Sequence, residues 1–409
     1  MEKHTMLYPS AYFTFFILSI SWTACAPEAV TGAKVQYRHL NGHHHLQNAP
    51  NSPKLFVFGD SYADTEAVTG AKVQYRHLNG HHHLQNAPNS PKLFVFGDSY
   101  ADTGNSPKST AISWKKPYGV SFPGKPSGRF SDGRVLTDYI ASFLGTTSPV
   151  PFNEWLGLGE KSALENGLNF AQGGTGVFTT LANGPNMTTQ INVFQQLVQE
   201  EEVYSPENMS SSVALVSVAG NDYAAYFGKS GTNENISDLI NITKSIMSQL
   251  VLDLQRIHGL GVRRVGVTAM HPLGCLPITT ASMSHKNCSE NGNSLAKFHN
   301  QMLQENIENL NNEAGAPVFV ILDLYSAFMS ALNLQNNHPG NSTFEDQLSP
   351  CCVGTERGYT CGSVKGLGIE KYIVCEDLKQ FFWDDIHPSQ QGWEAVYSAL
   401  KPSLQSLLN

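Results

Sequence analysis

Four short apolar segments, separated by helical stretches, constrain the fold of this 409-residue chain more than any other feature. The segments span residues 93–96, 213–218, 264–270 and 318–322. Continuous apolar runs of this length are typical of strands that are buried on both faces of a sheet. The spacing of apolar residues predicts helices over 189–202, 236–258, 294–314 and 389–408. Because strands and helices alternate, the sequence predicts a doubly wound parallel α/β sheet.

Two polar side chains follow the carboxyl ends of predicted strands, where parallel sheets bind their ligands. Ser99 follows the first strand in the sequence Gly-Asp-Ser, and Asn221 follows the second in Ala-Gly-Asn-Asp. A serine hydroxyl is a weak nucleophile until a base takes its proton. Gly-Asp-Ser alone is more typical of an ordinary turn than of an active site, so the presence of a base decides between the two interpretations.

The candidate base lies near the C-terminus, in the segment FWDDIHP at 382–388. An imidazole acts as a base when a carboxylate holds it in the correct tautomer. Asp384 precedes His387 by three residues, and Asp385 is the competing, less favoured partner. The alternative interpretation is a helix-capping Asp beside a surface His. Together with Ser99, these residues predict a catalytic triad of Ser99, Asp384 and His387.

Acyl transfer also needs hydrogen-bond donors for the charge that develops on the carbonyl oxygen. The glycine-rich segment NFAQGGTGV at 169–177 offers backbone N–H groups, and Asn221 offers its side-chain amide. A glycine-rich loop alone is weak support, because turns use glycine freely. Phosphate binding is not expected, since the chain has no G-x-x-x-x-G-K-[ST] pattern.

Residues 28–65 and 66–103 are identical, so the candidate nucleophile occurs twice, as Ser61 and Ser99. Two perfect copies indicate a tandem duplication or a gene-assembly error rather than a solenoid. A parallel sheet has one place for its first strand, and the copy that continues into the domain is expected to fill it. We therefore expect residues 27–89 to be a poorly ordered extension and residues 90–409 to be one catalytic domain. The extension contains histidine triplets that fit a solvated loop better than a metal site, and no metal is expected.

The N-terminus and the cysteines indicate a secreted, extracellular protein. Residues 1–26 combine a basic start, a short apolar stretch and an A-x-A pattern, which predict a signal peptide, with a short N-terminal anchor as the alternative. Six cysteines remain, and an even number in an exported chain suggests disulfides. Cys275 and Cys288 are expected to pair with each other. The pairing of the other four stays open, and they are Cys351, Cys352, Cys361 and Cys375.

Sequons and charge limit the surface chemistry of the chain. Six Asn-x-Ser/Thr sequons are expected to carry glycans, mostly on surface loops. They are Asn186, Asn208, Asn235, Asn241, Asn287 and Asn341. The net charge of −8, without a basic run, argues against nucleic acid and anionic membranes as partners. No apolar stretch is long enough to predict stable membrane insertion.

Six motifs, in this order along the chain, resemble the plant-type GDSL esterase/lipase branch of the SGNH hydrolases. They are FGDSYADTGN, SGRFSDGRVLTDYIA, NFAQGGTGV, VSVAGNDY, MHPLGCLP and FWDDIHP. The resemblance covers about 92–409 and implies a flavodoxin-like three-layer α/β/α sandwich, the SGNH hydrolase fold. It implies the same triad, with an oxyanion hole formed by the backbone N–H groups of Ser99 and Gly174 and the side chain of Asn221.

The sequence departs from this family pattern in two places. Tyr100 stands where the family name has Leu, and the duplicated segment is foreign to the pattern. The G-x-S-x-G elbow of the α/β-hydrolases is absent, which argues against that other esterase fold.

The predicted function is therefore that of a serine esterase/lipase that forms an acyl-enzyme on Ser99 and needs no cofactor. Its expected substrate is a small-molecule or lipid ester. Two alternatives remain on the same scaffold: an acyltransferase that uses the same triad, and a non-catalytic binding protein. The sequence does not distinguish among acyl lengths or oligomeric states.

Overall fold

A six-stranded parallel sheet forms the centre of the computed structural model, which describes residues 91–180, 182–230, 235–335, 338–339, 344 and 346–408. Its strands are β1 (Leu93–Gly97), β2 (Val150–Pro151), β3 (Gly167–Asn169), β4 (Val213–Ser217), β5 (Arg264–Thr268) and β6 (Phe319–Leu322). They pair in the order β2-β3-β1-β4-β5-β6, and every pair in this sheet is parallel. Without the short edge strand β2, this is the strand order of flavodoxin-like sheets. The predicted fold class is therefore confirmed.

Several predictions concern residues outside this described part of the chain. They are the signal peptide at 1–26, the extension at 27–89 with Ser61 and the histidine triplets, and the sequon at Asn341. These expectations, and the boundary at residue 90, stay predictions.

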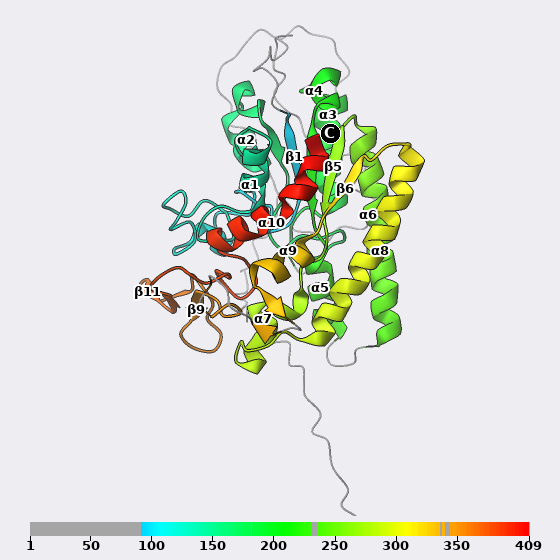
Figure 1. Ribbon diagram of the computed structural model, residues 1–409. Helices are drawn as coiled ribbons and strands as arrows, with labels where there is room; N and C mark the ends of the chain where they lie inside the picture. Colours follow the sequence, from blue (N-terminus) through cyan, green and yellow to red (C-terminus); the bar gives the residue numbers. More distant parts are fainter. Residues whose placement is uncertain are drawn as a thin grey trace, which may run out of the picture. The chain divides into compact units, whose positions relative to one another are not determined.

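Helices cover both faces of the sheet and give the fold three layers (Figure 1). On one face lie α1 (Leu136–Phe143), α9 (Leu324–Ala331) and α10 (Gln390–Leu408), and on the other lie α3 (Met187–Gln199), α6 (Ile236–Gly259) and α8 (Glu290–Ala314). The four predicted helices correspond to α3, α6, α8 and α10, and their ends differ by a few residues at most. The remaining α-helices of the described ranges are α2 (Phe152–Leu158), α4 (Pro206–Ser210), α5 (Gly220–Ser230) and α7 (Pro277–Thr280). No helix in the described ranges is long and apolar enough to cross a membrane.

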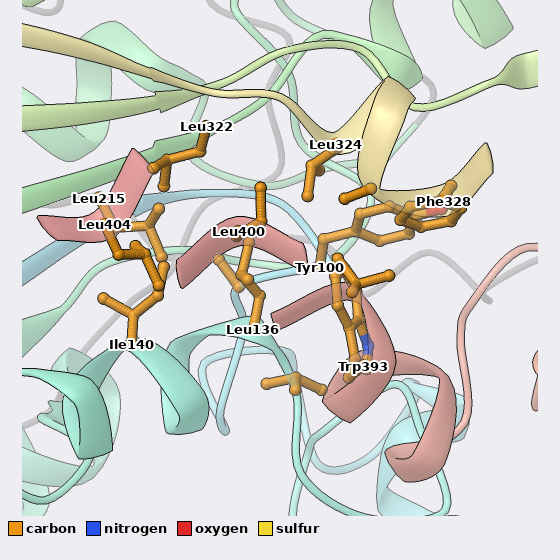
Figure 2. Close-up of a cluster of buried hydrophobic side chains, with 14 of the residues drawn as sticks. Tyr100, Leu136, Ile140, Leu215, Leu322, Leu324, Phe328, Trp393, Leu400 and Leu404 are labelled. Carbon is orange, nitrogen blue, oxygen red and sulfur yellow. The ribbon is translucent and has the colours of Figure 1, made fainter. Parts of the chain in front are cut away.

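Strand β1 illustrates why both faces of the sheet are buried, since successive side chains of a strand point to opposite faces. Leu93 and Val95 belong to a large apolar cluster with α1, α9 and α10. Figure 2 shows this cluster, in which side chains of these helices meet those of β4 and β6. Phe94 and Phe96 lie on the other face, with ring centroids 4.7 Å and 5.4 Å from that of Phe194 on α3. Burial of each such side chain contributes about 1.5–3 kcal/mol.

Three disulfides connect the described cysteines. Cys275–Cys288 is the predicted pair and is confirmed. The four remaining cysteines pair as Cys351–Cys375 and Cys352–Cys361. Around them lie short strand pairs, β9 (Cys352–Gly354) with β12 (Tyr372–Val374) and β10 (Val364–Lys365) with β11 (Ile369–Glu370). A separate pair, β7 (Leu334–Gln335) with β8 (His338–Pro339), follows α9.

A second, small core forms where two of these disulfides meet two aromatic side chains. We call it the disulfide cluster, and its buried members are Tyr118, Cys351, Cys352, Cys361 and Trp383. Unlike the main core, it has almost no regular secondary structure to support it.

The five described sequons are all at least partly exposed, and two of them lie within helices. Asn208 lies in α4 and Asn241 lies in α6, so the expectation of loop positions is wrong for these two. Asn186 and Asn235 cap the N-termini of α3 and α6, where short polar side chains satisfy free backbone N–H groups. Asn287 precedes the disulfide-bonded Cys288, and glycosylation at all of these positions stays a prediction.

Candidate active site

Ser99 and Asn221 lie at the point where the strand order of the sheet reverses. β1 pairs with β3 on one side and with β4 on the other, so the segments that leave β1 and β4 diverge at this edge. Ser99 comes two residues after the end of β1, and Asn221 is the second residue of α5, which follows β4. Open α/β sheets bind their ligands outside the carboxyl ends of the strands at such a reversal. The topology thus brings the two predicted residues to one site.

Gly97 allows β1 to end in the turn that carries Ser99. Its φ of 145° suits glycine, and a Cβ there would lie 2.1 Å from the carbonyl oxygen of Ser217 on β4. Gln190 of α3 binds both backbone groups of Gly97: its Oε1 accepts from the N–H at 2.8 Å, and its Nε2 donates to the carbonyl at 3.0 Å. These contacts fix the backbone two residues before Ser99, the predicted nucleophile.

The chain then winds into a single helical turn. The carbonyl oxygen of Asp98 accepts hydrogen bonds from the N–H groups of Ala101 and Asp102, at 3.1 Å and 2.9 Å. The carboxylate of Asp98 accepts a third, from the N–H of Tyr100 at 3.0 Å. The N–H groups at the start of a helical turn lack a partner within the turn. The backbone N–H of Ser99 has no acceptor among the described residues, so it is available to a ligand.

Ser99, His387 and Asp384 form a continuous chain of hydrogen bonds. The Oγ of Ser99 lies 2.8 Å from Nε2 of His387, and Nδ1 of His387 lies 2.8 Å and 2.9 Å from the two carboxylate oxygens of Asp384. A carboxylate can only accept, so Nδ1 carries the proton and Nε2 is left to accept from the serine hydroxyl. All three side chains are buried. The fold thus joins a hydroxyl and an imidazole that are 288 positions apart in the sequence.

Asp384 is held as a carboxylate by four donors. Its Oδ1 accepts from the backbone N–H groups of Ile386 and His387, and its Oδ2 accepts from the hydroxyl of Tyr118 at 2.7 Å. Burial favours a higher pKa for Asp384, but the charge and hydrogen bonds of His387 outweigh it, and the pKa lies below its ordinary value. For Asp385, the competing partner, burial and the neighbouring Asp384 raise the pKa to about 6. The only described carboxylate bonded to the ring of His387 is that of Asp384.

Two carboxylates shape the predicted glycine-rich loop. Asp222 of α5 accepts from the consecutive N–H groups at 177–178, at 2.9 Å and 2.8 Å. Asp102 accepts from the N–H of Gly173 at 2.9 Å. Gly174 follows with φ of 81°, and its own N–H has no acceptor among the described residues. The two predicted backbone donors of the oxyanion hole, at Gly174 and in the nucleophile turn, are therefore both available.

The predicted third donor, the amide of Asn221, is already engaged within the protein. Its Nδ2 donates to the carbonyl oxygen of Thr175 at 2.9 Å and to Oδ2 of Asp98 at 3.4 Å. The second contact is long for a hydrogen bond. The amide is thus oriented between the glycine-rich loop and the nucleophile turn.

Further buried titratable groups lie near Ser99, His387 and Asp384. Burial raises the pKa of Asp98 to about 7 and that of Asp222 to about 6. Burial also lowers the pKa of His271 to about 3, so this imidazole is neutral at physiological pH. Among the residues that the structure describes, no three His, Cys, Asp or Glu side chains are grouped so that they could hold a metal ion.

Comparison with known proteins identifies the family of the chain. Residues 93–400 match the family described as GDSL-like Lipase/Acylhydrolase. The chain belongs to this family. It is 49% identical over 370 residues to a GDSL esterase/lipase of Arabidopsis thaliana, which covers 90% of this chain and 91% of that protein. A second GDSL esterase/lipase of Arabidopsis thaliana is 45% identical over 356 residues, 87% of this chain and 89% of that protein.

This GDSL esterase/lipase is accordingly an ester hydrolase. Among solved structures, a lipase from a goat rumen metagenome is 12% identical, covers 76% of this chain and 97% of its own, and has a TM-score of 0.36. A likeness of that size carries no argument about the site.

Tyr118 could not be found from the sequence, although its hydroxyl contacts Asp384 of the predicted triad. Tyr118 lies in the loop between β1 and α1, 266 positions from Asp384, and no motif links the two. Gln190 could not be found either, because in the sequence it looks like any polar residue of an amphipathic helix and no motif links it to Gly97. Contacts of this kind depend on tertiary packing and leave no local pattern.

Proposed function

We propose that this GDSL esterase/lipase cleaves carboxylic esters through an acyl-enzyme on Ser99. His387 takes the hydroxyl proton at Nε2 while Oγ attacks the ester carbonyl, and the Asp384 carboxylate stabilises the imidazolium that forms. The imidazolium then gives the proton to the leaving alkoxide as the carbon–oxygen bond breaks. In the second half-reaction His387 takes a proton from water as the water oxygen attacks the acyl carbon. The bond between that carbon and Oγ of Ser99 then breaks, the imidazolium returns the proton to Oγ, and the acid is released.

One observation carries this proposal: the hydrogen-bonded chain from Ser99 Oγ through both ring nitrogens of His387 to Asp384. Hydrogen bonds of 2.8 Å to 2.9 Å lie within the range that proton transfer between nucleophile and base needs. The N–H groups of Ser99 and Gly174, with the amide of Asn221, are our candidates for binding the oxyanion. The mechanism uses only protein groups, and its substrates are small-molecule or lipid esters.

We also infer that the protein is secreted. The three disulfides are typical of an oxidising compartment, and they agree with the signal peptide predicted at 1–26. Transfer of the acyl group to an alcohol would follow the same steps, with the alcohol in place of water. Product analysis with an added alcohol separates the two outcomes.

Ester hydrolysis by single-site variants tests the proposal. The full chain is assayed on p-nitrophenyl esters of increasing acyl length, as wild type, Ser99→Ala and Ser61→Ala. We expect Ser99→Ala to lose at least about 1,000-fold in kcat and Ser61→Ala to match the wild type. Equal activity of Ser99→Ala and wild type would refute the mechanism, and loss in Ser61→Ala alone would assign it to the other copy.

A further inference from the structure

The hydroxyl of Tyr118 makes a contact that hydrolysis by the triad does not itself explain. It donates to Oδ2 of Asp384 at 2.7 Å, and both side chains are buried. Oδ1 of the same carboxylate already receives two backbone N–H groups and the ring of His387. Among the residues that the structure describes, Oδ2 receives only the ring of His387 and the Tyr118 hydroxyl. Without Tyr118, this oxygen would keep a single described donor.

The ring of Tyr118 is fixed by the disulfide cluster. It packs edge-on against Trp383, with ring centroids 6.0 Å apart, and Trp383 directly precedes Asp384 in the chain. The half-cystines of the two C-terminal disulfides belong to the same cluster. Tyr118 therefore reaches the carboxylate from a rigid, water-excluding base.

The phenol can only act as a donor here. Burial and the nearby Asp384 charge raise the pKa of Tyr118 well above its ordinary value, so the hydroxyl keeps its proton. A hydrogen bond to an ionised group is stronger than a neutral one, and it withdraws part of the charge that the carboxylate presents to its other partners.

From these contacts we propose that Tyr118 is a positioning residue for catalysis, which fixes the orientation of the Asp384 carboxylate and tunes its charge toward His387. The inference rests on the proposed function, because it assigns a role through that triad. Removing the hydroxyl leaves more negative charge facing the imidazole. The imidazolium is then favoured, and the base His387 becomes protonated at a higher pH.

The test is the pH dependence of ester hydrolysis by Tyr118→Phe in the full chain. We expect kcat to fall about 10-fold and KM to change less than about two-fold, because the hydroxyl supports the acid of the triad rather than substrate binding. The acid limb of kcat/KM should move up by about half a pH unit. A purely structural role would lower stability without moving this limb.

Tyr139→Phe is the matched control. The hydroxyl of Tyr139 donates to the backbone carbonyl of Gln390 at 2.9 Å, on the face of α1 against α10. Tyr139→Phe also removes one tyrosine hydroxyl, but this hydroxyl does not contact the triad. The kcat and the acid limb of kcat/KM should therefore stay at wild-type values. Far-UV circular dichroism and the thermal midpoint of each variant report whether the chain is folded.

A second arm decides the matter even if Tyr118→Phe does not fold. Replacement of Tyr118 by 3,5-difluorotyrosine keeps the shape of the ring but makes the hydroxyl a stronger donor, so the acid limb should move to lower pH. An unchanged limb in the arms that fold would overturn the inference. Ser99→Ala in the same assay separates the two proposals. If Ser99→Ala is inactive, an unchanged acid limb refutes the role of Tyr118 but leaves the proposed function intact. If Ser99→Ala is active, the proposed function itself fails.

Discussion

The proposed nucleophile and its proposed base are positioned by two regions that differ in almost every structural respect. Ser99 leaves the end of β1, in the middle of the sheet, and the preceding backbone is fixed by β4 and α3. His387 lies in a loop before α10, and its carbonyl accepts from the N–H of Trp383 at 2.7 Å. The carbonyl of Trp383 in turn accepts from the N–H of Cys352 at 2.7 Å. The loop is thus tied directly to a disulfide-bonded residue.

This difference teaches that one active site can depend on two kinds of stability. A central strand is held by the hydrogen bonds and apolar contacts of the whole sheet, so its end moves only if the fold opens. The base loop has strands of two or three residues around it, and disulfides supply the constraint that a sheet would otherwise give. A disruptive substitution near the end of β1 should therefore unfold the protein. A disruptive change in the loop that carries His387 should mainly lower activity.

The largest effect is expected from Gly97→Ala on the nucleophile side. The new Cβ would lie 2.1 Å from a backbone oxygen of β4, at a φ that only glycine adopts readily. We expect the free energy of unfolding to fall by more than about 4 kcal/mol, with activity lost together with the fold. Chemical denaturation measures this change. Gly157→Ala is the control, because its Cβ would meet nothing within 4 Å, and a similar loss there would contradict the explanation.

The next effect concerns the base side, where Cys352→Ser and Cys361→Ser are combined. Their disulfide closes a short loop, so we expect a loss of about 2–3 kcal/mol in the free energy of unfolding. Activity should fall further, by about 10- to 100-fold, because the loop that carries Asp384 and His387 loosens. Far-UV circular dichroism should stay that of the wild type.

The matched comparison for that variant is Cys275→Ser with Cys288→Ser, which opens a disulfide in the main core. It should lose a similar amount of stability and much less activity. Equal losses of activity in both double variants would remove the distinction between the two regions.

The smallest expected effect is a pH-dependent change in stability on the nucleophile side, at Asp98. Burial raises the pKa of Asp98 to about 7 in the folded chain, from an ordinary value of 3.8. The folded state therefore binds more protons than the unfolded state between these values, and stability falls as the pH rises from about 4 to about 7. Asn cannot ionise, so Asp98→Asn should be more stable than the wild type by about 2 kcal/mol near pH 8. Thermal or chemical unfolding of wild type and variant near pH 4 and near pH 8 measures this difference. A gain in stability that is as large near pH 4 as near pH 8 would contradict the explanation.

Most of the sheet could be predicted because its strands are long enough to show a pattern. β4, for example, begins with four apolar residues in a row and ends close to Asn221. Both the strand and the site at its carboxyl end could therefore be predicted from the sequence. β2 and β3 could not be found in this way, since they have two and three residues and take their conformation from pairing with β1 and with each other.

The residues of the proposed triad could be proposed from the sequence for a related reason, whereas the side chains around them could not. Asp384 and His387 form one local segment, and Ser99 follows a predicted strand. The partners that orient these residues come from remote segments whose positions only the folded chain defines. Tyr118 is one such partner, and Gln190, which holds the backbone of Gly97 before Ser99, is another. The pairing of the last four cysteines was likewise undetermined, because adjacent Cys351 and Cys352 are equivalent in the sequence.

The central claim is that the Ser99 hydroxyl, and not its duplicate at Ser61, meets His387 in one site. A fluorophosphonate probe, which phosphonylates activated serine hydroxyls, tests this directly when the labelled chain is digested with trypsin and analysed by mass spectrometry. The two copies fall in peptides 55–72 and 93–108, which differ after the shared sequence LFVFGDSYADT. We predict an adduct at Ser99 in peptide 93–108 that is lost in His387→Ala. An adduct on peptide 55–72 alone, or equal labelling of Ser99 without His387, would contradict the account.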